Sequence, residues 1–166
     1  MRWIWIDTFV DFVSGERASA VKNVTLAEDC LRDHFPGYPV LPPSLMIEGM
    51  AQTAGILVGE ARGFAENVIL AKIRTVEFDD YAIPGDQLRY DAVLVSLDDR
   101  AAITSGTVYK NEKQIGRVDL IFSHVNQADK MLDLPDHNFV FTEQFVSLLA
   151  AFRGNIRDGG RKPDGS

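Results

Sequence analysis

The feature that most constrains the fold is a helix-length segment whose apolar side chains face every direction. It begins at Pro43, which suits a first helical position because the amide there has no partner within the helix. The segment is expected to run to about Arg62 and to end at Gly63. Apolar residues cover nearly its whole circumference: Leu45, Met46, Ile47, Met50, Ala51, Ala54, Ile56, Leu57 and Val58. A helix of this kind is buried, so other elements must surround it.

Small residues mark one face of this helix. Ala51, Gly55 and Gly59 recur every fourth position and therefore share a face. A face without bulky side chains lets another layer approach closely. We expect a sheet to pack there.

The remaining chain is rich in β-forming residues. Two extended segments, 3–13 and 18–25, are separated by Ser14-Gly15-Glu16 and predict a hairpin. After the helix come four more β-rich segments with short turns between them: 68–78, 87–97, 101–110 and 114–125. Long strands joined by short turns form antiparallel sheets. One buried helix with such strands predicts an α+β domain.

Length and the weakening pattern after Val125 set the expected domain organisation. A chain of 166 residues is the size of one domain. We expect residues 1–141 to form that domain and residues 142–153 to form a short amphipathic helix packed on it. The Gly-rich polar tail, 154–166, is expected to be disordered.

Charge and composition exclude several kinds of partner. With 24 acidic and 17 basic residues, the formal net charge is -7. No general footprint for a phosphate backbone is present, so nucleic acid is not an expected partner. The longest apolar stretch, 45–58, contains polar residues and is shorter than the ~20 residues of a membrane span. A single cysteine, Cys30, allows no internal disulfide and suits a reducing compartment. We expect a cytoplasmic protein with no membrane partner.

Two titratable residues stand out by position. His34 lies at the start of a stiff loop with four prolines, and Glu48 lies in the early part of the apolar helix, fourteen residues later. Burial favours the uncharged form of a carboxyl group, and imidazole exchanges protons near neutrality. One base and one acid in an apolar cleft suit an elimination, in which a C–H proton is removed and a departing hydroxyl is protonated. Gln52, four residues after Glu48, shares its helix face and is placed to hold the carboxyl.

Spacing alone does not establish this pair. A histidine in a loop is usually a surface residue, and a glutamate near a helix start usually interacts with the helix dipole. His124 and His137 lack the spacing of a metal site and are expected to have structural or surface roles.

A longer motif connects the two residues. Residues 34–52 read HFPGYPVLPPSLMIEGMAQ. This string resembles the active-site segment HFPxxPxxPGxLxxEAxAQ of the FabZ-type beta-hydroxyacyl-acyl-carrier-protein dehydratases of bacteria. The resemblance extends to Lys22-Asn23-Val24-Thr25 upstream and to Phe78 and Pro84-Gly85-Asp86-Gln87-Leu88 downstream. It covers roughly residues 3–125.

The resemblance implies a hotdog fold, in which an antiparallel sheet wraps a long central helix. It also implies a homodimer, or a hexamer built as a trimer of dimers, with active sites at the subunit interface. His34 of one chain would face Glu48 of the other as the two catalytic residues. The expected substrate-binding residues are Tyr38, Pro43, Ser44, Gln52 and Phe78, and Ser44 is included because its N–H and hydroxyl lie next to Pro43 in the first turn of the helix. The implied substrate is a beta-hydroxyacyl thioester on acyl carrier protein or coenzyme A, and no metal or organic cofactor is expected.

Two departures from the pattern bear on function. Pro43 replaces the glycine whose N–H, in the resembled family, is thought to bind the substrate carbonyl, and proline has no such donor. Acidic Glu77, Asp79 and Asp80 flank Phe78, where the family tends to have basic residues suited to an acidic carrier protein. Repulsion of such a carrier is expected there.

The sequence therefore predicts a dehydratase of fatty acid or related acyl synthesis, with two alternatives open. A hotdog isomerase or thioesterase would use the same helix carboxylate on an acyl thioester. A non-catalytic acyl-thioester-binding protein would result if Pro43 had disabled the carbonyl donor.

Overall fold

A computed structural model of the chain describes residues 4–125 and 140–141. The described elements are, in chain order, β1 (Thr8–Val13), β2 (Arg17–Asn23), a short 3-10 turn η1 (Asp29–Leu31), α1 (Pro43–Ala61), β3 (Asn67–Phe78), β4 (Gln87–Leu97), β5 (Ala101–Lys110) and β6 (Lys113–Val125). They follow the expected segments closely, and the expected α+β class is confirmed.

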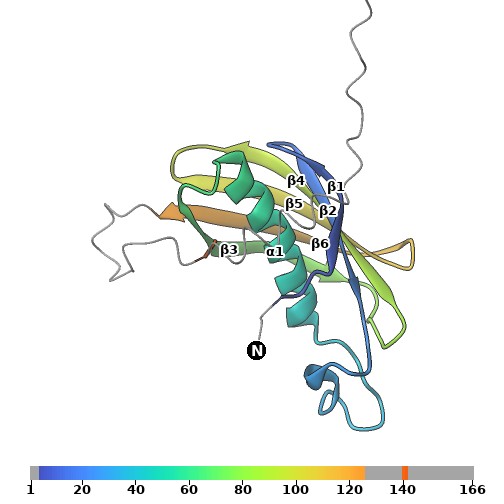
Figure 1. Cartoon of the computed structure of the whole chain (residues 1–166). Coiled ribbons are helices and arrows are strands. Elements are labelled where there is room, and N and C mark those ends of the chain that lie inside the picture. Colours follow the sequence, from blue (N-terminus) through green and yellow to red (C-terminus); the bar gives the residue numbers. More distant parts are fainter. Residues whose placement is uncertain (1–3, 126–139, 142–166) are drawn as a thin grey trace, which may run out of the picture.

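The described strands form one antiparallel, six-stranded sheet in the order β1-β2-β4-β5-β6-β3. The sheet curves around α1, which lies against one face (Figure 1). The tight turn between β5 and β6 uses Asn111 and Glu112 at φ of 48° and 73°, a left-handed conformation that asparagine adopts more readily than most residues. Buried residues alternate with more exposed ones along β5 and along most of β6, as expected for a sheet with one buried face.

Helix α1 begins and ends where proline and glycine chemistry predicts. Pro43 occupies its first turn, and the Leu45 amide donates to the Pro42 carbonyl at 2.9 Å. At the other end Gly63 has a φ of +63°, a conformation that lets the chain leave the helix and turn toward β3. Twelve of its residues are buried, so the expectation of a buried helix is confirmed.

The close approach of helix and sheet differs from the expectation. The tightest contact on α1 is at Gly49, where an added Cβ would lie 2.5 Å from the ring of Tyr90 on β4. At Gly55 an added Cβ would lie 3.4 Å from the Phe122 ring, an ordinary contact, and Ala51 and Gly55 line a pocket. The small-residue face therefore borders a pocket at Ala51 and Gly55 instead of packing directly on the sheet, and at Gly59 it meets Phe141 and Phe64.

Strand β3 is an edge of the described sheet. It pairs with β6 on one side, and its residues from Leu70 to Arg74 are exposed. The expected amphipathic helix, 142–153, and the expected tail, 154–166, lie outside the described residues. Within residues 4–125 and 140–141, we find no helix with the length and apolar character of a membrane span.

Candidate active site

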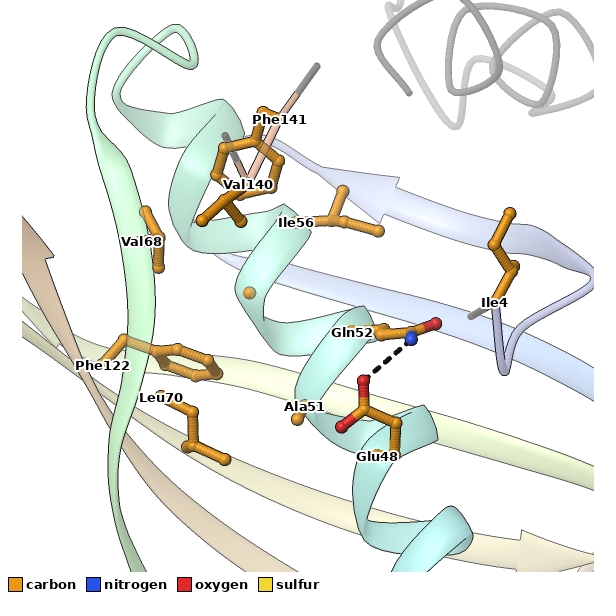
Figure 2. Close-up of a pocket in the computed structure, with 11 residues that line it drawn as sticks. Ile4, Glu48, Ala51, Gln52, Ile56, Val68, Leu70, Phe122, Val140 and Phe141 are labelled. Atoms are coloured by element: carbon orange, nitrogen blue, oxygen red, sulfur yellow. Dashed lines mark hydrogen bonds between the residues drawn. The ribbon is translucent and has the colours of Figure 1, made fainter. Parts of the chain in front are cut away.

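A pocket of about 310 Å³ opens between α1, β3 and β6. Figure 2 shows Glu48 and Gln52 as the polar side chains beside a cavity that is otherwise apolar. The lining residues come from distant parts of the chain: Ile4, Glu48, Ala51, Gln52, Gly55, Ile56, Val68, Leu70, Phe122, Val140 and Phe141. A mostly apolar cavity with a few placed polar groups is typical of a small-ligand site.

Glu48 is oriented by a short chain of hydrogen bonds. Gln52 Nε2 donates to Glu48 Oε1 at 2.9 Å (Figure 2), and the Trp5 amide donates to Gln52 Oε1 at 2.8 Å. Because the Trp5 amide can only donate, the Gln52 carbonyl oxygen faces it and the NH₂ group faces Glu48. Gln52 is therefore the donor, and Glu48 the acceptor, in the hydrogen bond between them. The sequence predicted the Glu48–Gln52 pair but not the role of Trp5.

His34 is held by the backbone of Val40. Its Nδ1 lies 2.8 Å from the Val40 carbonyl oxygen, and the Val40 amide donates to the His34 carbonyl at 2.8 Å. Since a carbonyl oxygen only accepts, Nδ1 carries the hydrogen, and in the neutral ring Nε2 has the lone pair. The ring also stacks on Phe35 with centroids 4.3 Å apart. His34 is thus arranged to accept a proton at Nε2.

One chain does not bring His34 into the pocket that contains Glu48. His34 lies in the loop between η1 and α1, before the N-terminal end of the helix, and it is not among the lining residues. Glu48 lies more than one turn into the helix, beside the cavity. The two residues predicted to act together are separate within the single chain.

Pro43 and Ser44 lie exposed in the first turn of α1. The amides of Leu45 and Met46 both point to the Pro42 carbonyl, at 2.9 and 3.4 Å. Ser44 lies four residues before Glu48, on the same face of the helix. Its amide precedes the first intrahelical bond and has no acceptor within the helix.

The other two predicted substrate-binding residues lie apart from this pocket. Tyr38 is exposed at the tip of the proline loop, where its backbone exchanges two hydrogen bonds of 2.9 Å with Phe35. Phe78, at the end of β3, packs closely over Gly116 of β6 and against the core. Neither lines the cavity beside Glu48 in this chain.

The acidic residues around Phe78 are partly neutralised by lysines. Asp80 forms an ion pair of 2.6 Å with Lys110 and a longer one of 3.9 Å with Lys113. The hydrogen bond from Lys110 holds the pKa of Asp80 below its ordinary value. Glu77 lies opposite Arg117 in the β3–β6 register. The surface there is a mixture of charges, which weakens the repulsion of an acidic partner that the sequence suggested.

Several functional positions had only weak signals in the sequence. Inward-facing Val68 and Phe122 follow the strand alternation, but alternation does not say which core residues border a cavity. Gly49 replaces the alanine of the family pattern, and the ring of Tyr90 occupies the space that the methyl group would take. Phe141 lies far from the motif in sequence, and no pattern connects the two.

No group of three or more His, Cys, Asp and Glu residues suited to a metal ion occurs in the part of the chain that the structure describes. His124 is buried with its Nδ1 3.4 Å from Glu66 Oε2, and desolvation lowers its pKa. His124 therefore has the structural position expected for it. His137 lies outside the described residues.

Comparison with known proteins identifies the family. The model of the FabA-like domain matches residues 4–119, which include the helix, the proline loop and five of the strands. The chain belongs to the FabA-like domain family. The predicted family is confirmed.

Two relatives of the chain have dehydratase names. A 3-hydroxyacyl-[acyl-carrier-protein] dehydratase FabZ of Granulibacter bethesdensis is 44% identical over 92 residues, which cover 54% of this chain and 54% of the relative. The FabZ of Enterococcus faecalis is 33% identical over 119 residues, covering 71% of this chain and 83% of the relative. The chain thus spans about half of the first relative and most of the second. These relatives support the predicted hydro-lyase class of enzyme.

Solved structures with the same fold are more distant in sequence. The dehydratase heterocomplex ApeI:P of Xenorhabdus doucetiae matches with a TM-score of 0.56 at 18% identity, over 68% of this chain and 92% of that one. The PaaI protein of E. coli matches with a TM-score of 0.59 at 12% identity, over 73% of this chain and 80% of that one. The predicted hotdog fold of this FabA-like domain is confirmed.

Proposed function

We propose that this FabA-like protein removes water from a 3-hydroxyacyl thioester and forms the trans-2-enoyl thioester. The observation that carries the proposal is the oriented carboxyl of Glu48 beside an apolar pocket, with Gln52 holding one of its oxygens at 2.9 Å. An apolar cavity suits an acyl chain, and the adjacent carboxyl suits proton transfer to a hydroxyl on that chain. The names of the FabZ relatives support the same reaction.

A second copy of the chain is proposed to complete the site. His34 and Glu48 lie apart within one chain, so a joint role requires His34 from a partner. The exposed edge strand β3 offers a means of association, because it has Leu70 and Ile73 exposed by 36% and 44% and unpaired edges readily add another strand. Leu70 also lines the pocket, so a partner along β3 would cover the cavity. The proposed active unit is therefore a homodimer.

We assign one proton transfer to each of the two residues. Nε2 of neutral His34, with Nδ1–H bonded to Val40, takes the proton from C2 of the substrate. Protonated Glu48 gives its proton to the C3 hydroxyl, which leaves as water while the C2–C3 double bond forms. His34 ends protonated and Glu48 ionised, and transfer of one proton from His34 to Glu48 restores the starting state. General acid and base groups of this kind commonly contribute about 10² to 10⁴ in rate.

The thioester carbonyl needs a hydrogen-bond donor because negative charge develops on its oxygen as C2 loses a proton. Pro43 has no N–H, and the Leu45 amide is already bonded to Pro42. We assign this role to the Ser44 amide, where the free amides and dipole of a helix N-terminus favour an anion. A donor at such an oxyanion is worth about 2.7 to 4 kcal/mol in the transition state.

Turnover assays distinguish this proposal from its alternatives. Purified protein is mixed with a 3-hydroxyacyl thioester of coenzyme A and, separately, of acyl carrier protein, and the products are identified by mass spectrometry. Dehydration yields the 2-enoyl thioester. Release of free thiol would identify a thioesterase, and migration of the double bond in a 2-enoyl thioester, without loss of water from the 3-hydroxyacyl thioester, would identify an isomerase. Tight binding of both thioesters without any product would favour the non-catalytic binding protein.

A further inference from the structure

The end of the pocket opposite Glu48 is closed by an aromatic side chain. Figure 2 shows Phe141 at that end, above Ile56. Phe141 packs on Gly59, where an added Cβ would lie 2.6 Å from its ring. Its ring also contacts Phe64 edge-on, with centroids 5.0 Å apart. Helix, loop and Phe141 together form a wall across the cavity.

Phe141 is held firmly although it lies beyond the last strand. Only 7% of its surface is exposed. The neighbouring Val140 amide donates to Asn67 Oδ1 at 3.3 Å, which ties this pair of residues to the start of β3. The family match ends at residue 119, so this wall comes from a part of the chain outside the matched domain.

The distance from Glu48 to the wall can be estimated from the helix. Glu48, Ala51, Gln52, Gly55 and Ile56 line the pocket along one face of α1. Eight residues of helix, at 1.5 Å each, span about 12 Å. Extended covalent chains advance about 1.2 Å per bond, as three backbone bonds span up to 3.6 Å, so the pocket takes about eight to ten carbons beyond the reacting atoms.

We propose that Phe141 acts as the stop for the acyl chain and restricts the substrates to medium length, about eleven to thirteen carbons in total, because C1 to C3 of the thioester add to the eight to ten carbons that the pocket takes. The inference rests on the proposed function, because it assigns the pocket to the acyl part of the dehydratase substrate. Phe141 is a specificity residue in this account. It would contact the far end of the acyl chain, about 12 Å from the reacting atoms as measured along α1.

The test uses two opposite changes and a matched control in the full-length protein. Phe141→Ala removes the wall. Gly55→Leu fills the middle of the pocket, where an added Cβ at Gly55 would lie 3.4 Å from the Phe122 ring. Phe12→Ala removes a half-buried phenylalanine that does not line the pocket. Each variant is assayed with 3-hydroxyacyl thioesters of four to sixteen carbons, and binding of the saturated acyl-CoA series is measured in parallel by calorimetry.

We expect wild type and Phe12→Ala to share one optimum at medium length. Phe141→Ala should raise kcat/KM for fourteen and sixteen carbons at least tenfold relative to eight, and Gly55→Leu should retain four carbons while losing ten and twelve at least tenfold. Should Phe141→Ala not fold, Gly55→Leu decides alone. Identical length profiles in the variants and wild type would overturn the inference while leaving the dehydratase intact. A third outcome is that no thioester is turned over at any length, while the variants shift the length preference of acyl-CoA binding in the directions given above. That outcome would rule out the proposed reaction and would still support Phe141 as the stop for the acyl chain.

Discussion

Gln52 donates a hydrogen bond from Nε2 to Oε1 of Glu48 at 2.9 Å, one helical turn away. The Trp5 amide occupies the other end of the Gln52 side chain at 2.8 Å. The carboxyl group that we propose as the proton donor therefore has one oxygen held in place. This arrangement joins the N-terminal segment before β1 to the middle of α1.

Replacement of Gln52 by leucine tests this positioning role. Gln52→Leu should lower kcat about tenfold or more, with a smaller change in KM, because Glu48 loses its orienting donor. The free energy of unfolding should fall by about 1 to 3 kcal/mol, since the Trp5 amide loses its acceptor. Denaturant unfolding and the pH profile of kcat are measured together. A changed stability with unchanged kcat and pH profile would reduce Gln52 to a structural residue.

The proposed two-chain site predicts complementation between inactive variants. His34→Ala and Glu48→Gln should each lower turnover about 100-fold and remain folded. When the two variants are co-expressed, half of the dimers are mixed and each has one intact site, so about a quarter of wild-type activity should return. Each variant alone provides the control. If mixed dimers form but activity stays at the level of the single variants, the proposal that His34 and Glu48 of one site come from different chains is wrong.

The first turn of α1 gives a separate prediction. Pro43→Gly should leave activity unchanged or raise it, because it adds a second amide beside that of Ser44. Ser44→Pro should lower kcat by about 100-fold or more, as expected for loss of an oxyanion donor. Ser44→Ala removes only the hydroxyl and serves as the control for the amide. Full activity of Ser44→Pro would show that another group binds the carbonyl.

Two glycines of α1 should respond oppositely to alanine. Gly49→Ala should destabilise the protein by about 1 to 3 kcal/mol, because its methyl group would overlap the Tyr90 ring. Gly55→Ala should be neutral or stabilising, since its methyl group has an ordinary contact of 3.4 Å with Phe122 and alanine favours the helix. Denaturant titration of both variants measures the difference. Equal stability would mean that Tyr90 can move away from Gly49.

His124 makes stability depend on pH. Desolvation lowers its pKa in the folded chain, with Glu66, Arg62, Asp98 and Asp99 as the charged groups nearby. The unfolded chain, with an ordinary pKa of about 6.5, then binds more protons than the folded chain just below that pH. The free energy of unfolding should therefore fall as the pH drops below about 6.5.

Replacement of His124 isolates this effect. His124→Gln should flatten the pH dependence of unfolding between about pH 5 and 7. Stability curves at a series of pH values provide the measurement. An unchanged slope in His124→Gln would assign the dependence to other groups.

Much of the fold followed from short-range patterns. The apolar circumference after Pro43, the glycine at position 63 and the alternating strands predicted α1 and the six strands closely, because these patterns reflect helix and strand periods and turn chemistry. The proline loop and the helix motif also pointed to His34, Glu48 and Gln52 as neighbours of a reaction site.

Contacts between distant residues required the tertiary structure. The sequence by itself determined which segments form helix and strands, and which residues carry proton-transfer chemistry, because both depend on near neighbours in the chain. Only the fold decided that the Trp5 amide orients Gln52, that Tyr90 fills the space at Gly49, and that Phe141 closes the pocket. These contacts depend on strand register and on how side chains fill the core, and periodicity determines neither.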